Sequence, residues 1–249
     1  MARAKLRQIF DADADFLDSL DDIKSCDEVL ARTRDVLVAK GIARMSYHFA
    51  PPFHSQTGER AVIYQHGFPD DWMRLYLDAG FRAADPVPGI VMAQTAPMTW
   101  IDALAQADER PETAAFVRQL RAHGLEHGVG VPLFGPGGRD AYSSFDLARP
   151  MTDADRPLTR QFREIAQAAH LRVSHLVLEE VNQGSQLSMR ETEVLSWLVA
   201  GKSRTDIGTI LDLSPATIDT YQRRIFAKLD VNDRLHAALS ALSRGLVQL

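Results

Sequence analysis

The stretch that decides the fold of this 249-residue chain is Lys202–Leu229, KSRTDIGTILDLSPATIDTYQRRIFAKL. Two helix starts stand out in it. Ser203 can cap a first helix, with Asp206 three residues later in a relative of the capping box, and Ser214 followed by Pro215 marks a second start. The pattern predicts two helices, over 204–211 and from 215 onward, joined by a tight turn.

The second of these helices has one apolar and one basic side. Ile218, Ile225 and Leu229 share a face at helical spacing. From the basic row alone, the more economical interpretation is a solvated face on a small helical bundle. The alternative is a helix-turn-helix that enters the major groove of DNA. The outward row carries hydrogen-bond donors and positive charge, and comprises Thr217, Thr220, Tyr221, Arg223, Arg224 and Lys228.

Two further helices complete this unit, one over about 189–200 and one over about 234–243. The whole segment resembles the DNA-binding domain of LuxR-type transcription regulators. The resemblance implies that the outward row binds DNA, with Lys202 and Arg204 beside it. Tyr221 stands where many relatives carry histidine, which bears on the preferred DNA sequence. The matching residues are Glu191, Leu195, Gly201, Ile207, Ser214, Thr217, Ile218, Ile225, Lys228 and Leu229.

Composition limits the class of protein. The hydrophobic content of 45% supports real cores, and Cys26 is the only cysteine, which suits a reducing compartment. No membrane-spanning run or secretion signal is seen, so we expect a cytoplasmic protein. The net charge is −5, yet residues 184–249 hold 8 Lys and Arg against 7 Asp and Glu. DNA binding therefore belongs to the carboxyl end, and sensing to the acidic part before it.

The expected fold class is α+β. Residues 1–182 predict an α/β/α sandwich with an antiparallel sheet, 183–186 a linker, and 187–249 an all-α four-helix domain. The long helix carries Leu171, Val173, Leu176 and Leu178, for which a dimer contact and a core role are equally open. The first domain should contain helices at 6–20, 27–40, from 69, 112–123 and 154–182, and strands at 45–49, 61–64, 128–134 and 141–147.

A cluster of aromatic residues around one carboxylate indicates a ligand pocket in this domain. Trp72 and Tyr76 share a helix face, and Asp85 lies among apolar residues. Taken singly, the tryptophans are explained as core and Asp85-Pro86 as a helix start. The combined pattern is similar to the acyl-homoserine lactone binding domain of the LuxR family. That pattern is Trp72-x3-Tyr76-x4-Phe81-x3-Asp85-Pro86-Val87, then Thr99-Trp100, then Gly124-x3-Gly128.

The resemblance implies a role for each pocket residue. Trp72 would donate its indole hydrogen to the lactone carbonyl, and Asp85 would accept from the ligand amide. Phe68 stands where many relatives have a tyrosine whose hydroxyl meets the acyl carbonyl. The ligand is therefore either a lactone with a hydrophobic or aromatic acyl group, or a different small molecule. The remaining candidate residues are Tyr76, Trp100, Ser144, Tyr64, Phe81 and Val87.

These expectations combine into a ligand-responsive transcription regulator of quorum sensing. It would bind its small-molecule autoinducer and then double-stranded promoter DNA as a homodimer, with RNA polymerase as a candidate further partner. We expect no enzyme activity, cofactor or metal, because the histidines are scattered and no nucleophile elbow occurs. The alternatives are a sensor of a non-lactone ligand, a phosphorylation-driven response regulator and an enzyme fused to a helix-turn-helix.

Overall fold

The computed structural model describes residues 14–49, 62–78, 81–136, 138–183 and 187–247. Tertiary contacts divide the chain into two compact units, residues 1–174 (unit 1) and 175–249 (unit 2). This division falls inside one long helix, α8, which spans Arg156–Gln183. Residues 184–186 of the predicted linker lie outside the described part, and the domain limits at 182 and 187 stay a prediction.

Unit 1 is built on a five-stranded antiparallel sheet with the order β2-β1-β5-β4-β3. All four strands expected from the sequence are present, and the hairpin of β4 with β5 is confirmed. The fifth strand, β3, has only two residues, too few to produce an alternating pattern. The strands are Arg44–Phe49 (β1), Val62–His66 (β2), Met98–Thr99 (β3), Val129–Leu133 (β4) and Ala141–Asp146 (β5).

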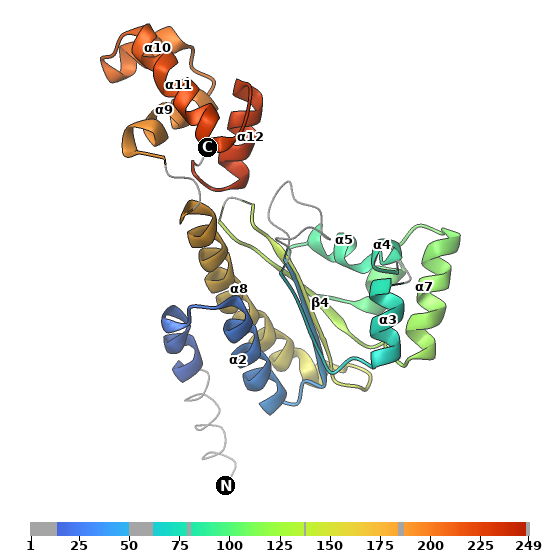
Figure 1. Ribbon diagram of the computed structural model, residues 1–249. Helices are drawn as coiled ribbons and strands as arrows, with labels where there is room; N and C mark the ends of the chain where they lie inside the picture. The colour runs from blue at the N-terminus through green and yellow to red at the C-terminus, as the bar shows by residue number, and fades with distance from the viewer. Residues whose placement is uncertain (1–13, 50–61, 79–80, 137, 184–186, 248–249) are drawn as a thin grey trace. The chain divides into compact units, whose positions relative to one another are not determined.

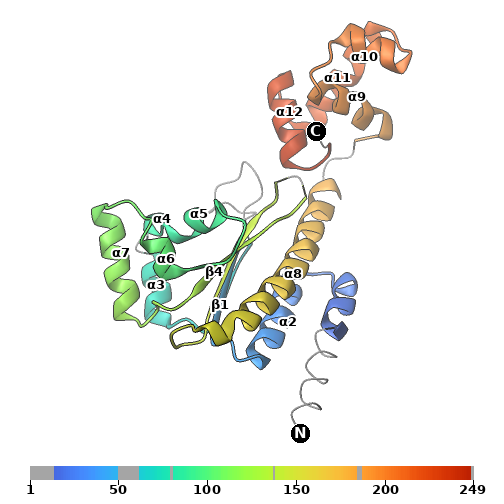
Figure 2. The ribbon, with the colours of Figure 1, turned by 180° about the vertical axis from the view of Figure 1, so that it is seen from behind.

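Helices cover both faces of this sheet, which confirms the α+β sandwich (Figures 1 and 2). On one face lie α2 and the unit 1 part of α8, where the rings of Phe145 and Phe162 are 4.4 Å apart. The shorter helices cover the other face. The helices are Cys26–Ala39 (α2), Asp70–Asp78 (α3), Phe81–Ala84 (α4), Val87–Met92 (α5), Trp100–Leu104 (α6) and Pro111–Ala122 (α7).

The start of the chain was expected to be helical over 6–20, and residues 6–13 of that helix lie outside the described range. Residues 14–19 are helical and continue into a 3-10 turn, Leu20–Asp22. Arg172 on α8 fixes this region, since its guanidinium donates two hydrogen bonds, of 3.0 and 2.7 Å, to the carbonyl of Ile23.

On the same helix Val173 is fully buried, whereas Leu171 is 48% exposed. Val173 therefore serves the core, and Leu171 remains a candidate for a dimer contact.

Unit 2 contains the four helices predicted from the sequence, and their starts follow the predicted caps. The hydroxyls of Ser188, Ser203 and Ser214 each accept a backbone N–H from the first turn of their helix. Ile207, Ile218 and Ile225 are fully buried at the centre. None of the helices in the described ranges is long and apolar enough to cross a membrane. The helices are Met189–Val199 (α9), Arg204–Leu211 (α10), Pro215–Leu229 (α11) and Arg234–Ser243 (α12).

Candidate ligand pocket and DNA-binding surface

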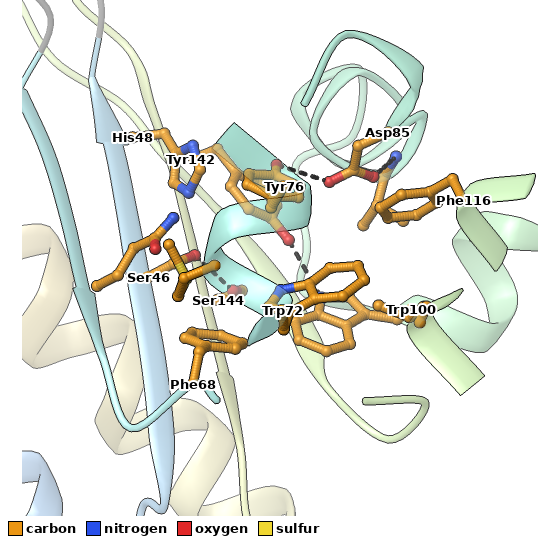
Figure 3. Close-up of a pocket in the computed structure, with 14 residues that line it drawn as sticks. Ser46, His48, Phe68, Trp72, Tyr76, Asp85, Trp100, Phe116, Tyr142 and Ser144 are labelled. Atoms are coloured by element: carbon orange, nitrogen blue, oxygen red, sulfur yellow. Dashed lines mark hydrogen bonds between the residues drawn. The ribbon is translucent and has the colours of Figure 1, made fainter. Parts of the chain in front are cut away.

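A cavity, partly open to solvent, lies between the sheet and the short helices of unit 1 (Figure 3). Most of its walls are apolar or aromatic, with a few polar groups among them, as is typical of small-molecule sites. The α3 helix supplies Trp72, Met73 and Tyr76, and the chain just after α4 supplies Asp85. The lining residues are Ser46, His48, Gln65, Phe68, Trp72, Met73, Tyr76, Asp85, Val87, Trp100, Phe116, Leu120, Tyr142 and Ser144.

Asp85 is the single acidic residue in this lining. Its Oδ2 accepts a hydrogen bond of 2.9 Å from the hydroxyl of Tyr76, and its Oδ1 one of 2.9 Å from the backbone N–H of Val87. Burial raises the pKa of Asp85 to about 6, and these two hydrogen bonds partly oppose the rise. At neutral pH Asp85 is thus an ionised acceptor in an apolar wall.

The tryptophans hold different positions around the same cavity. Trp100 donates its indole N–H to the hydroxyl of Tyr142 at 3.1 Å. Its ring lies so close to Gly128 that a β-carbon there would be 2.4 Å from the indole, so only glycine fits. Trp72 packs against Tyr76, with ring centres 5.7 Å apart. No described residue accepts from the indole N–H of Trp72, which leaves that donor for a ligand.

The structure brings most of the predicted pocket residues together. Trp72, Tyr76, Asp85, Trp100, Ser144, Phe68 and Val87 all line the cavity. Phe81 does not reach it and packs behind it, with its ring 6.3 Å from that of Phe116. The prediction for Tyr64 is wrong. Side chains alternate along β2, and Tyr64 faces away from the pocket, where its hydroxyl accepts a 3.2 Å hydrogen bond from Arg34 of α2.

Half of the lining was not predicted, because those residues come from several separate elements. Ser46 and His48 are two residues apart on β1, and this spacing in a strand predicts that they lie on the same face of the sheet. Which face carries the pocket is decided only by tertiary structure. Burial lowers the pKa of His48 to about 4, helped by the positive charge of Arg82, so this imidazole is neutral at physiological pH. The unpredicted lining residues are Ser46, His48, Gln65, Met73, Phe116, Leu120 and Tyr142.

In unit 2, four of the predicted DNA-binding residues lie together on α11. Thr217, Thr220, Tyr221 and Arg224 line a shallow hollow with Ala216. Lys202, just before α10, is exposed, as expected. Lys228 has another contact, because its ammonium lies 2.6 Å from Oε2 of Glu191, whose side chain is only 4% exposed. Lys228 therefore links α11 to α9 as well as adding charge to the surface.

The remaining two arginines of the predicted set share one carboxylate. Asp219 on α11 accepts from Arg223, at 2.9 Å from Nε, and lies 2.6 Å from Arg204 of α10. The hydrogen bond from Arg223 and the charges of both arginines lower the pKa of Asp219. Asp219 was not among the predicted residues, although its spacing of four residues from Arg223 on a helix indicates such a pair.

Models of known protein families match both units. Residues 25–173 match the autoinducer binding domain, and residues 185–241 match the bacterial regulatory proteins of the luxR family. The first match alone covers more than half of the chain. The cavity lies within the first match and the α11 surface within the second, so both candidate sites fall in the segments that these family models describe.

Individual relatives agree with this division. The chain is 27% identical over 239 residues to the HTH-type quorum sensing-dependent transcriptional regulator RpaR of Rhodopseudomonas palustris, covering 94% of each chain. It is 31% identical to the HTH-type transcriptional regulator y4qH of Sinorhizobium fredii, over 73% of this chain and 56% of that relative's length. The crystal structure of Escherichia coli SdiA superimposes with a TM-score of 0.75 over 96% of this chain and 99% of that one, at 22% identity.

Proposed function

Because the chain belongs to the LuxR family of quorum-sensing transcription regulators, we propose that unit 1 binds an N-acyl-homoserine lactone and unit 2 a dyad-symmetric promoter site. The observation that carries the lactone proposal is that the donor Trp72 and the acceptor Asp85 line the same cavity. An indole can only donate a hydrogen bond, and an ionised carboxylate can only accept one. A lactone carbonyl and an amide N–H supply the complementary groups.

In the proposed arrangement the lactone carbonyl meets the Trp72 indole and the ligand amide N–H meets Asp85. The aromatic rings of Tyr76 and Trp100 would enclose the lactone ring, and Ser144 would lie near the acyl carbonyl. Asp85 is held for this role by Tyr76 and the N–H of Val87, so its carboxylate does not have to reorganise on binding.

The first test is native mass spectrometry with thermal melting of the full chain, prepared with and without lactones that carry short, long and aryl acyl groups. Replacement of Trp72 by Phe keeps a ring in the wall and removes the donor, so the affinity should fall about tenfold. Trp197→Phe in unit 2 is the matched control and should leave the affinity unchanged. A protein that retains no lactone, and whose melting none of them shifts, would contradict the proposal.

A non-lactone ligand is the second candidate, because Phe68 lines the cavity where a tyrosine hydroxyl would otherwise be available. Phe68→Tyr should raise the affinity for lactones with simple acyl chains, by up to about tenfold, through a new hydrogen bond to the acyl carbonyl. Titration of both proteins with the same lactone panel measures this effect. Equal affinities throughout would show that this position has no part in ligand selection.

For DNA binding we propose a homodimer that places two copies of α11 in successive major grooves, on half-sites about one helical turn apart. The exposed hollow of α11 and the nearby basic residues support this role. Sedimentation of the protein with and without ligand tests the dimer, and a monomer under both conditions would contradict it. Contact with RNA polymerase stays a prediction.

A further inference from the structure

Polar side chains form one row across the sheet on the face that lines the pocket. Cross-strand pairing places Ser46 opposite Gln65 on one side and opposite Ser144 on the other, and Ser144 opposite Gly130. Directly opposed residues point to the same face, with β-carbons about 5 Å apart. A β-carbon on Gly130 would lie 2.7 Å from Val91, so the row ends there against apolar atoms. The row therefore presents Gln65, Ser46 and Ser144 to the cavity.

The two serines of this row already have partners. Their hydroxyl oxygens lie 2.7 Å apart, and both side chains are buried. At the other end of the row, the Oε1 atom of Gln65 is buried and accepts no hydrogen bond from the residues that the structure describes. A buried acceptor without a donor is costly, so this atom indicates a donor on whatever fills the cavity.

We propose that the ligand of unit 1 carries a hydroxyl on its acyl group and that Gln65 accepts a hydrogen bond from this hydroxyl. The inference rests on the proposed lactone function and extends it. Two of the acceptors in the lining are the carboxylate of Asp85 and the amide oxygen of Gln65. A plain acyl-homoserine lactone has a single donor, its amide N–H, which Asp85 takes. A second donor is needed for Gln65.

The position of Gln65 places this hydroxyl on the acyl group. Ser144, which would lie near the acyl carbonyl, is separated from Gln65 by two strand spacings, about 10 Å along the sheet. The second donor is therefore several bonds beyond the carbonyl and away from the lactone ring. Arg82 lines a neighbouring hollow together with His48, and its positive charge disfavours an ammonium group as the donor. A neutral hydroxyl fits both conditions.

Isothermal titration of the full chain tests this with homoserine lactones of one acyl length. The acyl group is unsubstituted, hydroxylated at carbon 3, or hydroxylated further along. At least one hydroxylated lactone should bind the wild-type protein about five- to tenfold more tightly than the unsubstituted one. Gln65→Met, which keeps the length of the side chain, should abolish this preference. Gln94→Met, the same substitution at an exposed position outside the lining, should leave the preference intact.

A second measurement does not depend on the ligand. Because Gln65→Met removes a buried acceptor that lacks a donor, the ligand-free variant should melt at a higher temperature than the wild type. Equal wild-type affinities for plain and hydroxylated lactones would overturn the inference and leave the lactone proposal standing, since water then satisfies Gln65. A preference that survives in Gln65→Met would also overturn it. If no lactone binds at all, the proposed function fails and this inference falls with it.

Discussion

Asp85 is an acid held among aromatic rings, and its ionisation costs free energy in the ligand-free protein. The pKa of the buried carboxyl is about 6, against an ordinary value of 3.8, because burial disfavours the charge more than Tyr76 and Val87 favour it. The folded state therefore binds more protons than the unfolded state between pH 4 and 6. It follows that the free energy of unfolding decreases as the pH rises through this window.

Asp85→Asn should remove this dependence. Between pH 4 and 7 the free energy of unfolding of the wild type should fall by about 2 kcal/mol because of this residue, at 1.36 kcal/mol per pKa unit. The variant loses none of it, so the ligand-free variant should gain in stability relative to the wild type as the pH rises, while its lactone affinity drops at least tenfold. Thermal melts of both proteins at half-unit steps from pH 4 to 7.5 measure the difference. A difference that is constant with pH would show that Asp85 titrates at an ordinary pKa.

At the scale of the element, α11 combines a basic surface with one acid that neutralises part of it. Asp219 contacts both Arg204 and Arg223, whereas Arg224 forms no ion pair among the described residues. A carboxylate at this place repels DNA phosphates and competes with them for the two guanidinium groups. In the proposed complex we therefore expect Asp219 to lower the affinity for duplex DNA, most of all for DNA that offers only phosphates.

Asp219→Asn should bind non-specific duplex DNA more tightly. The logarithm of its binding constant should fall more steeply with the logarithm of salt concentration, by about 1 to 2 units of slope, as two arginines become available to phosphates. Arg224→Ala should show the opposite, with weaker binding and a slope smaller by about 1. Both variants should take up ligand as the wild type does. Fluorescence anisotropy across a series of salt concentrations gives the slopes, and an unchanged slope in Asp219→Asn would place Arg204 and Arg223 away from the phosphates.

Local signals were enough to predict the helices of unit 2. Ser203 with Asp206, and Ser214 with Pro215, act within one turn of chain, so their effect is visible in the sequence. The pocket depends on distant pairings that no local pattern contains. Tyr64 was assigned to the wrong face because the direction of β2 side chains is fixed only by its pairing with β1, and Gln65 was missed for the same reason.

At the scale of the whole molecule, we expect two separate thermal unfolding transitions, because the chain divides into two compact units. A ligand that binds only native unit 1 stabilises that unit by about 2.7 kcal/mol at a hundred times its dissociation constant. Lys228→Met leaves the buried carboxylate of Glu191 without its cation, which should cost unit 2 about 1–3 kcal/mol.

Scanning calorimetry should therefore show two transitions in the full chain. Lactone should raise one of them, by about 5–10 °C, and leave the other in place. Lys228→Met should lower the other and leave the ligand-dependent one unchanged. Arg156→Met, which removes an exposed ion pair with Asp153, is the control and should shift neither transition measurably. A single transition that responds to both changes would show that the two units unfold as one.

The row of Gln65, Ser46 and Ser144 across the sheet also limits when the pocket can form while the chain is being synthesised. Ser46 and Ser144 are neighbours in the pocket floor but 98 residues apart in the chain. At a translation rate of about 5–20 residues per second, β1 waits roughly 5–20 s for β5 to emerge from the ribosome. During that interval the edge of β1 that later pairs with β5 has no partner strand. We therefore expect the proposed ligand to assist folding only after β5 has emerged, because the two serines of the pocket floor do not meet before then.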